Sequence, residues 1–463
     1  MTDEIGEECG IMGIFNGENV VRNVATGLYA LQHRGQESTG IAATNGKKVR
    51  VSKTMGLVAN LVNNGKLDSI VENSFAAIGH VRYSTTGSRT LANAQPILVT
   101  CKWGYLAVVH NGNITNAHEI RAEMEACGHI FQSTSDSEVL LHEISRTKAD
   151  NLSDAIRIAV QRFKGSFCLL FLTAETMYAV RDGFGFRPFC IGTKNNSYVF
   201  ASESCAFDLL GVEYLRDVQP GEFLTIDKDG MHSESLIKKE KRAYCIFEFI
   251  YFARPDSKIF EQSADKIRRK MGKKLAEESP VDADIIIPCP DSSTTAALGY
   301  AQESGIQFEI GLLRNHYVGR TFIDPSQNVR EQKVKLKFNT ISGVLKDKKV
   351  CLVDDSIVRG TTLKIICKML RDAGAKEVHI RIASPPVKFP CYFGMDFPSP
   401  EELAANILEP NEIGKMLNVE SIGYLSIKGM YECTGAPNDF CGACFDGIYQ
   451  EEFSSTAKNR CGG

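Results

Sequence analysis

The stretch KVCLVDDSIVRGTTLKIICKML, residues 349–370, decides the fold of the second half of the chain. Its apolar run, residues 350–353, is typical of a parallel strand that is buried on both faces. The run ends at Asp354 and Asp355, and a helical pattern begins at Thr361 after a short polar loop. A second apolar run, ADIIIP at residues 283–288, precedes another helical pattern. Strands that alternate with helices predict a doubly wound parallel α/β sheet.

The loop after the first of these strands has the composition of an anion-binding site. Successive backbone N–H groups and a helix N-terminus attract phosphate, and Gly360 allows a close approach. Hydroxyl groups at Ser356, Thr361 and Thr362 add donors, so the loop predicts a monophosphate pocket. The adjacent carboxylates suit ribose hydroxyls or a hydrated Mg²⁺ ion. The alternative is a solvated strand end followed by an ordinary helix cap.

Two further segments of this half contain polar groups that could complete a site. The run DSST, residues 291–294, follows the second strand, and helix capping explains it as well as ligand binding does. The segment from Arg314 to Asn339 is basic and weakly periodic, which is typical of a solvated loop or of a lid that closes over an anionic substrate. Its cations are Arg320, Arg330, Lys333, Lys335 and Lys337.

Length and composition set the class of protein. The chain has 463 residues, enough for two or three domains, and its net charge of −3 provides no global attraction for nucleic acid or an anionic membrane. We find no signal peptide and no apolar run of the roughly 20 residues that would span a bilayer, so we expect a cytoplasmic protein. In a reducing compartment, the 15 cysteines favour thiols or metal ligands over disulfides.

The first half predicts a mixed α+β domain. Short β-type runs such as GIMGIF at residues 10–15 and FCLLFL at 167–172 are separated by turn residues, and helical patterns cover residues 117–127 and 137–146. The polar, basic stretch at residues 238–242 marks the boundary between the halves. We therefore expect domains at residues 9–237 and 238–463.

Cys9 opens the first apolar run, where a cysteine is ordinarily a packing residue. If residues 1–8 were removed as a propeptide, Cys9 would carry a thiol and a free α-amine, whose pKa of about 8 suits a general base. The motif HNGNI, residues 110–114, could supply the Asn111 side chain and the Gly112 N–H to a tetrahedral oxyanion. Asn-Gly is also the strongest signal for a tight hairpin turn, and by itself the motif favours that turn.

Five motifs in this half, CGIMGIF, HRGQES, VRYSTTG, HNGNI and TSDSE, occur in an order that resembles the class II glutamine amidotransferases, which have an N-terminal-nucleophile (Ntn) hydrolase sandwich. The resemblance implies that Cys9 is the nucleophile and that Asn111 and Gly112 form the oxyanion hole. It also implies that Arg82 binds the carboxylate of glutamine and Asp136 its amino group.

The string VDDSIVRGTT resembles the phosphoribosylpyrophosphate signature of type I phosphoribosyltransferases. Both halves together resemble the amidophosphoribosyltransferases. This resemblance implies glutamine-dependent synthesis of 5-phosphoribosylamine for purine nucleotide formation, in a homotetramer inhibited by purine nucleotides. It assigns phosphoribosylpyrophosphate to Asp354, Asp355, Ser356, Arg359, Gly360, Thr361, Thr362 and Arg320, and Mg²⁺ to Ser292, Asp354 and Asp355.

A CxxC pair, Cys441 and Cys444, can place two thiolates on one metal centre, but a pair alone fits a redox-active or a simply packed pair of cysteines equally well. With Cys245 and Cys391 it resembles the ligand set of the iron-sulfur members of this family, which implies a [4Fe-4S] cluster. Four thiolates also suit tetrahedral zinc, so the residues alone leave both metals open.

Two other functions fit parts of the sequence. One is a different transferase or glutamine hydrolase that shares the cysteine domain, and the other is a non-catalytic sensor of phosphoribosylpyrophosphate or nucleotides. The presence of Cys9, of both carboxylates and of a basic lid in one chain argues against a sensor.

Overall fold

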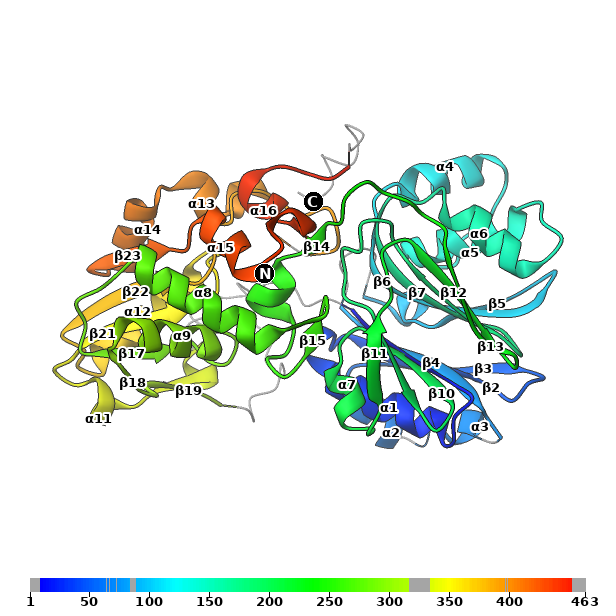
Figure 1. The fold of residues 1–463 in the computed structure, drawn as a ribbon, viewed down its shortest axis with the longest axis horizontal. Helices are drawn as coiled ribbons and strands as arrows, with labels where there is room; N and C mark the ends of the chain where they lie inside the picture. Colours follow the sequence, from blue (N-terminus) through cyan, green and yellow to red (C-terminus); the bar gives the residue numbers. More distant parts are fainter. Residues whose placement is uncertain are drawn as a thin grey trace.

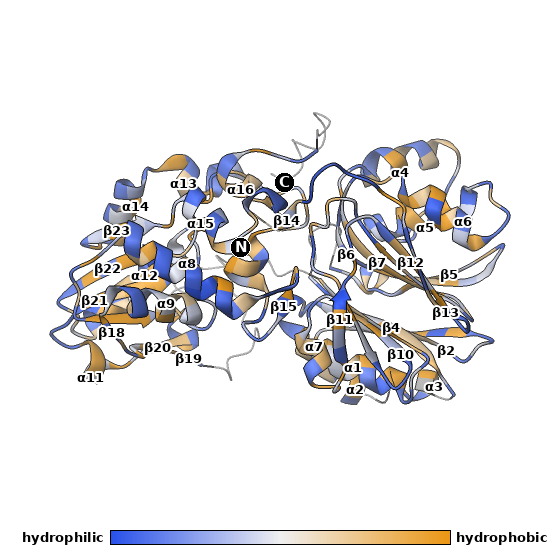
Figure 2. Ribbon diagram, in the orientation of Figure 1, coloured by the Kyte–Doolittle hydropathy of each residue, from blue (hydrophilic) through white to orange (hydrophobic). Residues whose placement is uncertain are grey.

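The computed structural model describes residues 9–63, 65, 67–71, 73–83, 89–315, 334–395, 397 and 399–451, and it contains two lobes that lie side by side (Figure 1). Figure 2 shows hydrophobic residues on the strands of both lobes, whereas hydrophobic and hydrophilic residues alternate along the helices. No helix in the described part of the chain is both long and apolar enough to cross a membrane.

Two antiparallel sheets form the centre of the first lobe. In spatial order, the first sheet consists of β11 (Glu213–Asp217), β9 (Cys190–Lys194), β10 (Ser197–Ala201), β1 (Gly10–Phe15), β4 (Ala76–Arg82), β2 (Ser38–Thr44) and β3 (Val49–Met55). The second consists of β13 (Gly230–Ser235), β12 (Glu222–Asp227), β8 (Met177–Arg181), β7 (Gly165–Leu172), β6 (Gly104–Ile114) and β5 (Ile97–Cys101). Alternate side chains of the two sheets, such as Ile11, Ile78 and Leu170, pack against each other in a shared core.

Helices cover the outer face of each sheet. The first sheet is covered by α1 (Val20–Ala30), α2 (Val58–Asn63), α3 (Asp68–Val71) and α7 (Cys205–Asp208), and the second by α4 (Ala117–Ala126), α5 (Asp136–Arg146) and α6 (Leu152–Val160). Two short 3₁₀ turns, η1 (Gln32–Arg34) and η2 (Leu91–Asn93), complete the lobe. The four layers, helix, sheet, sheet and helix, confirm the predicted sandwich.

The second lobe is built on a five-stranded sheet in which every described pair is parallel. Its order is β18 (Gln307–Phe308), β17 (Ile285–Pro288), β21 (Lys349–Asp354), β22 (Glu377–Ile382) and β23 (Ser421–Tyr424). Ile286 and Val353 face the core beneath α8 (Ala264–Glu278) and α9 (Thr294–Ser304), whereas Ile287 and Leu352 face the core beneath α12 (Thr361–Asp372) and α14 (Pro410–Leu417). Because both faces are covered, the strands are almost uniformly apolar, and the doubly wound prediction is confirmed.

The remaining elements of the second lobe are short. They are α11 (Ser342–Leu345), α13 (Ala404–Ile407), α15 (Ile427–Thr434), α16 (Ala443–Asp446), η4 (Pro400–Glu402), η5 (Pro437–Asp439), β15 (Lys258–Ile259), β16 (Gln262–Ser263), β19 (Leu312–Arg314) and β20 (Phe338–Thr340).

Between the lobes lie β14 (Tyr244–Cys245), the π-helical turn η3 (Glu248–Phe252) and β24 (Phe440–Cys441), which pairs with β14 (Figure 1). The exposed residues 238–242 run from the first lobe to β14, where we expected the domain boundary.

Candidate functional site

Cys9 is half-buried at the start of β1, the central strand of the first sheet. Its thiol donates to the carbonyl oxygen of Tyr83, just past the end of β4, at 3.3 Å. Burial raises the pKa of the thiol to about 11. The side chain is therefore protonated at neutral pH, and a base must remove its proton before it can act as a nucleophile.

Asn111 and Gly112 lie within β6, where they pair with Cys168 and Phe167 of β7. The hairpin reading of Asn-Gly is therefore wrong, because the ladder between β6 and β7 continues past these residues to Ile114. Gly112 has a φ of 142°, and a Cβ at this position would lie 2.2 Å from the Ser166 carbonyl oxygen. Only glycine fits there without strain.

Asn111 is connected to the strand that begins at Cys9. Its Nδ2 donates to the Ser202 hydroxyl at 3.3 Å, and the same hydroxyl accepts the backbone N–H of Ile11 at 3.0 Å. The charges of Arg82 and Asp136 also act on the Cys9 thiol. The structure thus gathers Cys9, Asn111, Arg82 and Asp136 around one place.

Asp136 begins α5 and is ionised at neutral pH. Burial opposes its ionisation, but His110 and backbone hydrogen bonds outweigh burial and hold the pKa of the carboxyl below its usual value. Its Oδ2 accepts the Ile114 N–H at 3.1 Å and lies 3.5 Å from His110 Nδ1. A buried carboxylate of this kind suits the ammonium group of an amino acid.

Arg82 ends β4 and is buried. Its Nη1 donates to Glu37 Oε1 at 2.8 Å. A guanidinium can bind a carboxylate through two parallel hydrogen bonds, so Arg82 has the chemistry expected for binding the carboxylate of glutamine. The sequence interpretation omitted its partner Glu37.

The second site lies at the carboxyl ends of β17 and β21, which are adjacent parallel strands. The Ser292 hydroxyl, from the loop after β17, donates to Asp355 Oδ2, and the Ser356 hydroxyl donates to Oδ1 at 2.7 Å. The Asp355 N–H donates to Asp354 Oδ1 at 2.9 Å. The structure therefore brings together the three residues that we expected to hold Mg²⁺.

The two carboxyl groups of this site destabilise each other. Burial raises the pKa of Asp354 well above its usual value, and the charge of Asp355 raises it further. Burial also raises the pKa of Asp355, although Ser292 and Ser356 donate to it and Arg268 is nearby. The positive charge of the described residues does not offset this burial, and a pair of acids in that state suits a divalent cation.

The predicted phosphate loop connects this pair to α12. Gly360 precedes the helix with a φ of 79°, so it supplies a left-handed conformation, and the amides of Thr361 and Thr362 lie in the first turn. Arg359 Nη2 donates to Glu402 at 3.2 Å. A helix of 12 residues with a glycine before its first turn has the geometry expected for binding a phosphate.

Part of the predicted lid lies outside the described residues, including Arg320, Arg330 and Lys333. Its base is an antiparallel ribbon of β19 and β20. Arg314, in β19, donates to Asp291 at 3.1 Å, which connects the base of the lid to the loop that contains Ser292.

The structure also brings the four expected cluster cysteines together. Cys245 and Cys441 are directly opposite each other in the pairing of β14 with β24. Burial raises the pKa of Cys444 well above its usual value, and the neighbouring thiols of Cys391, Cys245 and Cys441 contribute. All four are free thiols. In the part of the chain that is described, no group of three or more His, Cys, Asp or Glu side chains is arranged to hold a metal ion.

Comparisons with known proteins match both lobes. A glutamine amidotransferase domain matches residues 80–208, and a phosphoribosyl transferase domain matches residues 257–383. The amidophosphoribosyltransferase of Bacillus subtilis is 44% identical over 454 residues, covering 97% of this chain and 95% of the relative. That of Methanocaldococcus jannaschii is 45% identical, covering 96% and 98%. The chain belongs to the amidophosphoribosyltransferase family.

Two solved structures have the same fold as this chain. The glutamine phosphoribosylpyrophosphate amidotransferase from B. subtilis, complexed with ADP and GMP, matches with a TM-score of 0.92 at 43% identity, covering 96% of this chain and 98% of the other. A second structure, described as the allosteric regulatory enzyme of purine biosynthesis, matches with a TM-score of 0.93 at 44% identity, covering 97% of each chain.

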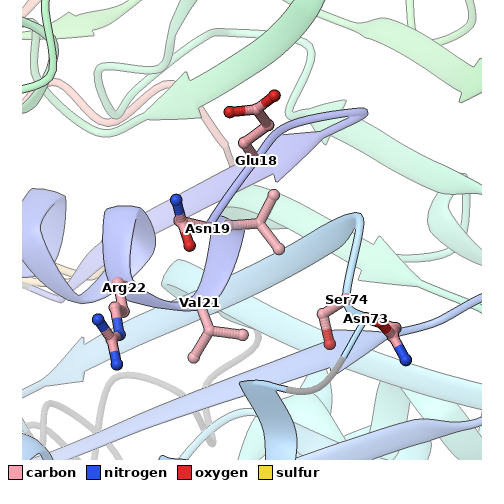
Figure 3. A pocket seen from close by; sticks show the side chains of 7 residues that line it. Glu18, Asn19, Val21, Arg22, Asn73 and Ser74 are labelled. Carbon is pink, nitrogen blue, oxygen red and sulfur yellow. The ribbon is translucent and has the colours of Figure 1, made fainter.

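Neither site coincides with the hollow of about 360 Å³ at the start of α1. Figure 3 shows the side chains around it, among them Glu18, Arg22 and Asn73. None of the residues lining it was predicted as a site residue.

Sequence reasoning missed several charged groups beside the glutamine site. Besides Glu37, they are Arg34, Glu203 and Glu248. Arg34 and Glu37 stand in the quoted motif HRGQES, so the motif was a usable signal for them. Glu203 and Glu248 had no such signal, because they come from distant parts of the chain.

Proposed function

We propose that this chain transfers the amide nitrogen of glutamine to phosphoribosylpyrophosphate and releases 5-phosphoribosylamine, pyrophosphate and glutamate. This reaction is the first committed step of purine nucleotide synthesis. The observation that carries the proposal is the presence of both sites in one chain, Cys9 beside Asn111 and Asp136 in the first lobe and the Asp354–Asp355 pair in the second. The family relationship over nearly the full length supports the same assignment.

In the first half-reaction, the Cys9 thiolate attacks the side-chain carbonyl carbon of glutamine. Removal of residues 1–8 frees the α-amine, which takes the thiol proton and returns it to the departing ammonia. Asn111 Nδ2 and the Gly112 N–H stabilise the oxyanion, and the glutamyl thioester is then hydrolysed to glutamate. Arg82 and Asp136 hold the α-carboxylate and the α-amino group.

In the second half-reaction, ammonia displaces pyrophosphate from C1 of the ribose. The loop from Ser356 to Thr362 holds the 5′-phosphate, with Arg359 and Arg320 adding positive charge. Asp354, Asp355 and Ser292 would hold Mg²⁺, which neutralises charge on the departing pyrophosphate when it is bound. We also propose that the loop containing Arg320 closes over the ribose and shields ammonia from bulk water.

The four cysteines would hold a [4Fe-4S] cluster that fastens the C-terminal segment to the body of the protein. The pairing of Cys245 with Cys441 and the effect of the neighbouring thiols on the pKa of Cys444 support one shared centre, and the family resemblance favours iron-sulfur over zinc. We further propose a cytoplasmic homotetramer that purine nucleotides inhibit, as the ADP and GMP of the B. subtilis complex suggest.

The test compares Cys9→Ala with the wild type in two assays. We expect glutamine-driven turnover to fall at least about 1000-fold, whereas turnover driven by ammonium salts should stay within about twofold. Cys127→Ala, at an exposed thiol remote from the first strand, is the matched control and should change neither rate. Equal survival of both activities in Cys9→Ala would overturn the assignment.

Intact mass together with iron and sulfide analysis of anaerobically purified protein tests the remaining parts. We expect a mature chain that begins at Cys9 and contains four irons per chain. A chain that retains residues 1–8 would contradict the α-amine mechanism, and zinc without iron would contradict the cluster.

A further inference from the structure

Four charged side chains are buried together where the two lobes meet. Arg34, Arg187 and Glu203 belong to the first lobe, and each of the four is at most 1% exposed. Glu248 begins η3, whose neighbouring side chains pack in the core of the second lobe, and is counted with that lobe. Two guanidinium groups and two carboxylates balance in charge, which is how a protein can keep such groups away from water. The described reaction uses none of these four side chains.

Arg34 is at the centre of this cluster and contacts the residue that bears the nucleophile. Its Nε donates to the backbone carbonyl oxygen of Cys9 at 3.1 Å. Its Nη1 donates to Glu203 at 2.6 Å and to Glu248 at 3.0 Å, and its Nη2 donates to the other oxygen of Glu248 at 2.7 Å. The bidentate pair with Glu248 fixes the plane of the guanidinium, and that plane determines where Nε points.

Both carboxylates are themselves held in place. Glu203 accepts the Ser257 hydroxyl at 2.6 Å and the Arg254 N–H at 2.9 Å, both from the second lobe. Glu248 lies 3.6 Å from Arg187 Nη1, and the Nη2 and Nε of Arg187 donate to the Phe393 carbonyl oxygen at 2.7 and 3.2 Å. His33 of the first lobe also lies 2.7 Å from Glu203, so the position of Arg34 depends on both lobes.

We propose that Arg34 is a positioning residue for the Cys9 nucleophile, and that Glu248 of the second lobe holds Arg34 in the orientation this requires. The inference rests on the proposed function, in which Cys9 becomes the first residue of the mature chain. A terminal residue is fixed by a peptide bond on one side only, so a hydrogen bond to the carbonyl oxygen of that bond helps to hold the residue and its thiol in place. An error of about 1 Å in the position of a reacting group can lower a rate about 100-fold.

The main test variant is Glu248→Gln, which keeps the size of the side chain. Its amide NH₂ would face an N–H of Arg34, so one of the two parallel hydrogen bonds is lost. We expect kcat with glutamine to fall between about 10-fold and 100-fold, KM for glutamine to change by less than about threefold, and ammonia-driven turnover to stay within about twofold. Arg34→Lys, which cannot bind all three acceptors in the same geometry, should show the same pattern.

The matched control is Glu222→Gln, in another bidentate pair of the first lobe. Glu222 binds Arg216 at 2.7 and 2.8 Å, and this pair is not part of the buried cluster. We expect the control to leave kcat with glutamine within about twofold. A fall in Glu248→Gln that is equal in the glutamine and ammonia assays would indicate a merely structural role and would overturn the proposal, as would wild-type rates in both.

The time course of Cys9 labelling by a diazoketone analogue of glutamine provides a second readout on the same samples. We expect Glu248→Gln to be labelled at least about 10-fold more slowly than the wild type, with full labelling at the end point. Labelling at the wild-type rate would contradict positioning. If the wild type itself shows no glutamine-driven turnover, the proposed function has failed, and that result is separate from these outcomes.

Discussion

Around Cys9, the buried charged side chains have partners within the protein: Arg82 binds Glu37 at 2.8 Å, and Asp136 accepts the Ile114 N–H at 3.1 Å. In the second lobe, by contrast, Asp354 and Asp355 are like charges in adjacent positions, and their pKa values are raised. The described residues of the glutamine site thus supply partners for its charged groups. In the proposed function, a cation and a substrate complete the phosphoribosyl site. Paired charges in the glutamine site favour the stability of the fold. In the phosphoribosyl site, the repulsion between Asp354 and Asp355 lowers stability at a place where a bound ligand can relieve it.

The strongest test of this contrast removes the acidic pair. In Asp354→Asn/Asp355→Asn, we expect both glutamine-driven and ammonia-driven turnover to fall at least about 100-fold, because the charge that holds Mg²⁺ at the departing pyrophosphate is lost. Steady-state assays with each nitrogen donor provide the measurement. Asp372→Asn, at an exposed position at the end of α12, is the control. If the double variant retained ammonia-driven turnover, the assignment of the acidic pair to the second site would be wrong.

A glycine pair on β6 tests the completeness of the glutamine site. Gly112 and Gly104 both have positive φ, 142° and 95°, but a Cβ at Gly104 meets nothing within 4 Å. We expect Gly112→Ala to lower glutamine-driven turnover at least about 10-fold, because its Cβ would displace the Ser166 backbone and move the oxyanion donors. Ammonia-driven turnover should stay within about twofold.

Gly104→Ala is the control for backbone strain alone, and we expect it to cost about 1 kcal/mol of stability with little change in either rate. If both alanine variants lost glutamine-driven turnover equally, strain in β6 and not the contact with Ser166 would explain the loss.

The two sites also differ in how far the sequence predicted them. Most of the phosphoribosyl site was predictable because residues 354–362 are contiguous, and the order of strand, loop and helix places them together. Ser292 joined them because adjacent parallel strands end at the same edge. Local chemistry and a simple topological rule were sufficient.

The glutamine site depends on antiparallel pairing between distant segments, which a local pattern cannot predict. Asn-Gly favoured a turn, but pairing with β7 extends β6 through both residues. Arg34 and Glu248 are 214 positions apart, so their bond follows from how the lobes dock and not from any motif. The helix predicted from residue 137 begins at Asp136 because Ser135 caps it.

The buried, neutral His80 allows the first lobe to be examined by pH. Burial lowers its pKa to about 3, and its Nε2 bonds the His110 carbonyl oxygen at 3.0 Å. In the unfolded chain His80 takes up a proton near pH 6.5, whereas in the folded lobe it stays neutral down to about pH 3. The free energy of unfolding therefore decreases as the pH falls from about 6.5 toward 3. At pH 5, which is about 1.5 units below the pKa of His80 in the unfolded chain, the decrease in the free energy of unfolding from this group is about 2 kcal/mol, because each unit contributes about 1.4 kcal/mol.

His80→Gln keeps a donor for His110 and removes the titration. We expect the wild type to lose about 2 kcal/mol more than His80→Gln between pH 7.5 and pH 5. Urea unfolding followed by Trp103 fluorescence measures this, because Trp103 is the single tryptophan and lies between β5 and β6. Parallel losses in the two proteins would show that His80 is protonated in the folded lobe.

The smallest expected effect is an increase in stability, and it separates the two sites most directly. Burial and the charge of Asp355 raise the pKa of Asp354, so the folded lobe is penalised at every pH where Asp354 is ionised. Asp354→Asn removes that penalty. At pH 7.5 we expect slower hydrogen exchange in β21, by a factor that corresponds to about 1 kcal/mol, while Trp103-detected unfolding of the first lobe stays unchanged.

The stability advantage of Asp354→Asn over the wild type should shrink as the pH falls, because the wild-type carboxyl then takes up a proton. Mg²⁺ should also slow exchange in the wild type more than in the variant, since the cation relieves the same repulsion. Faster exchange in Asp354→Asn, or an advantage that grows at low pH, would mean that the second site is as well balanced as the first and that its acidic pair does not depend on a ligand.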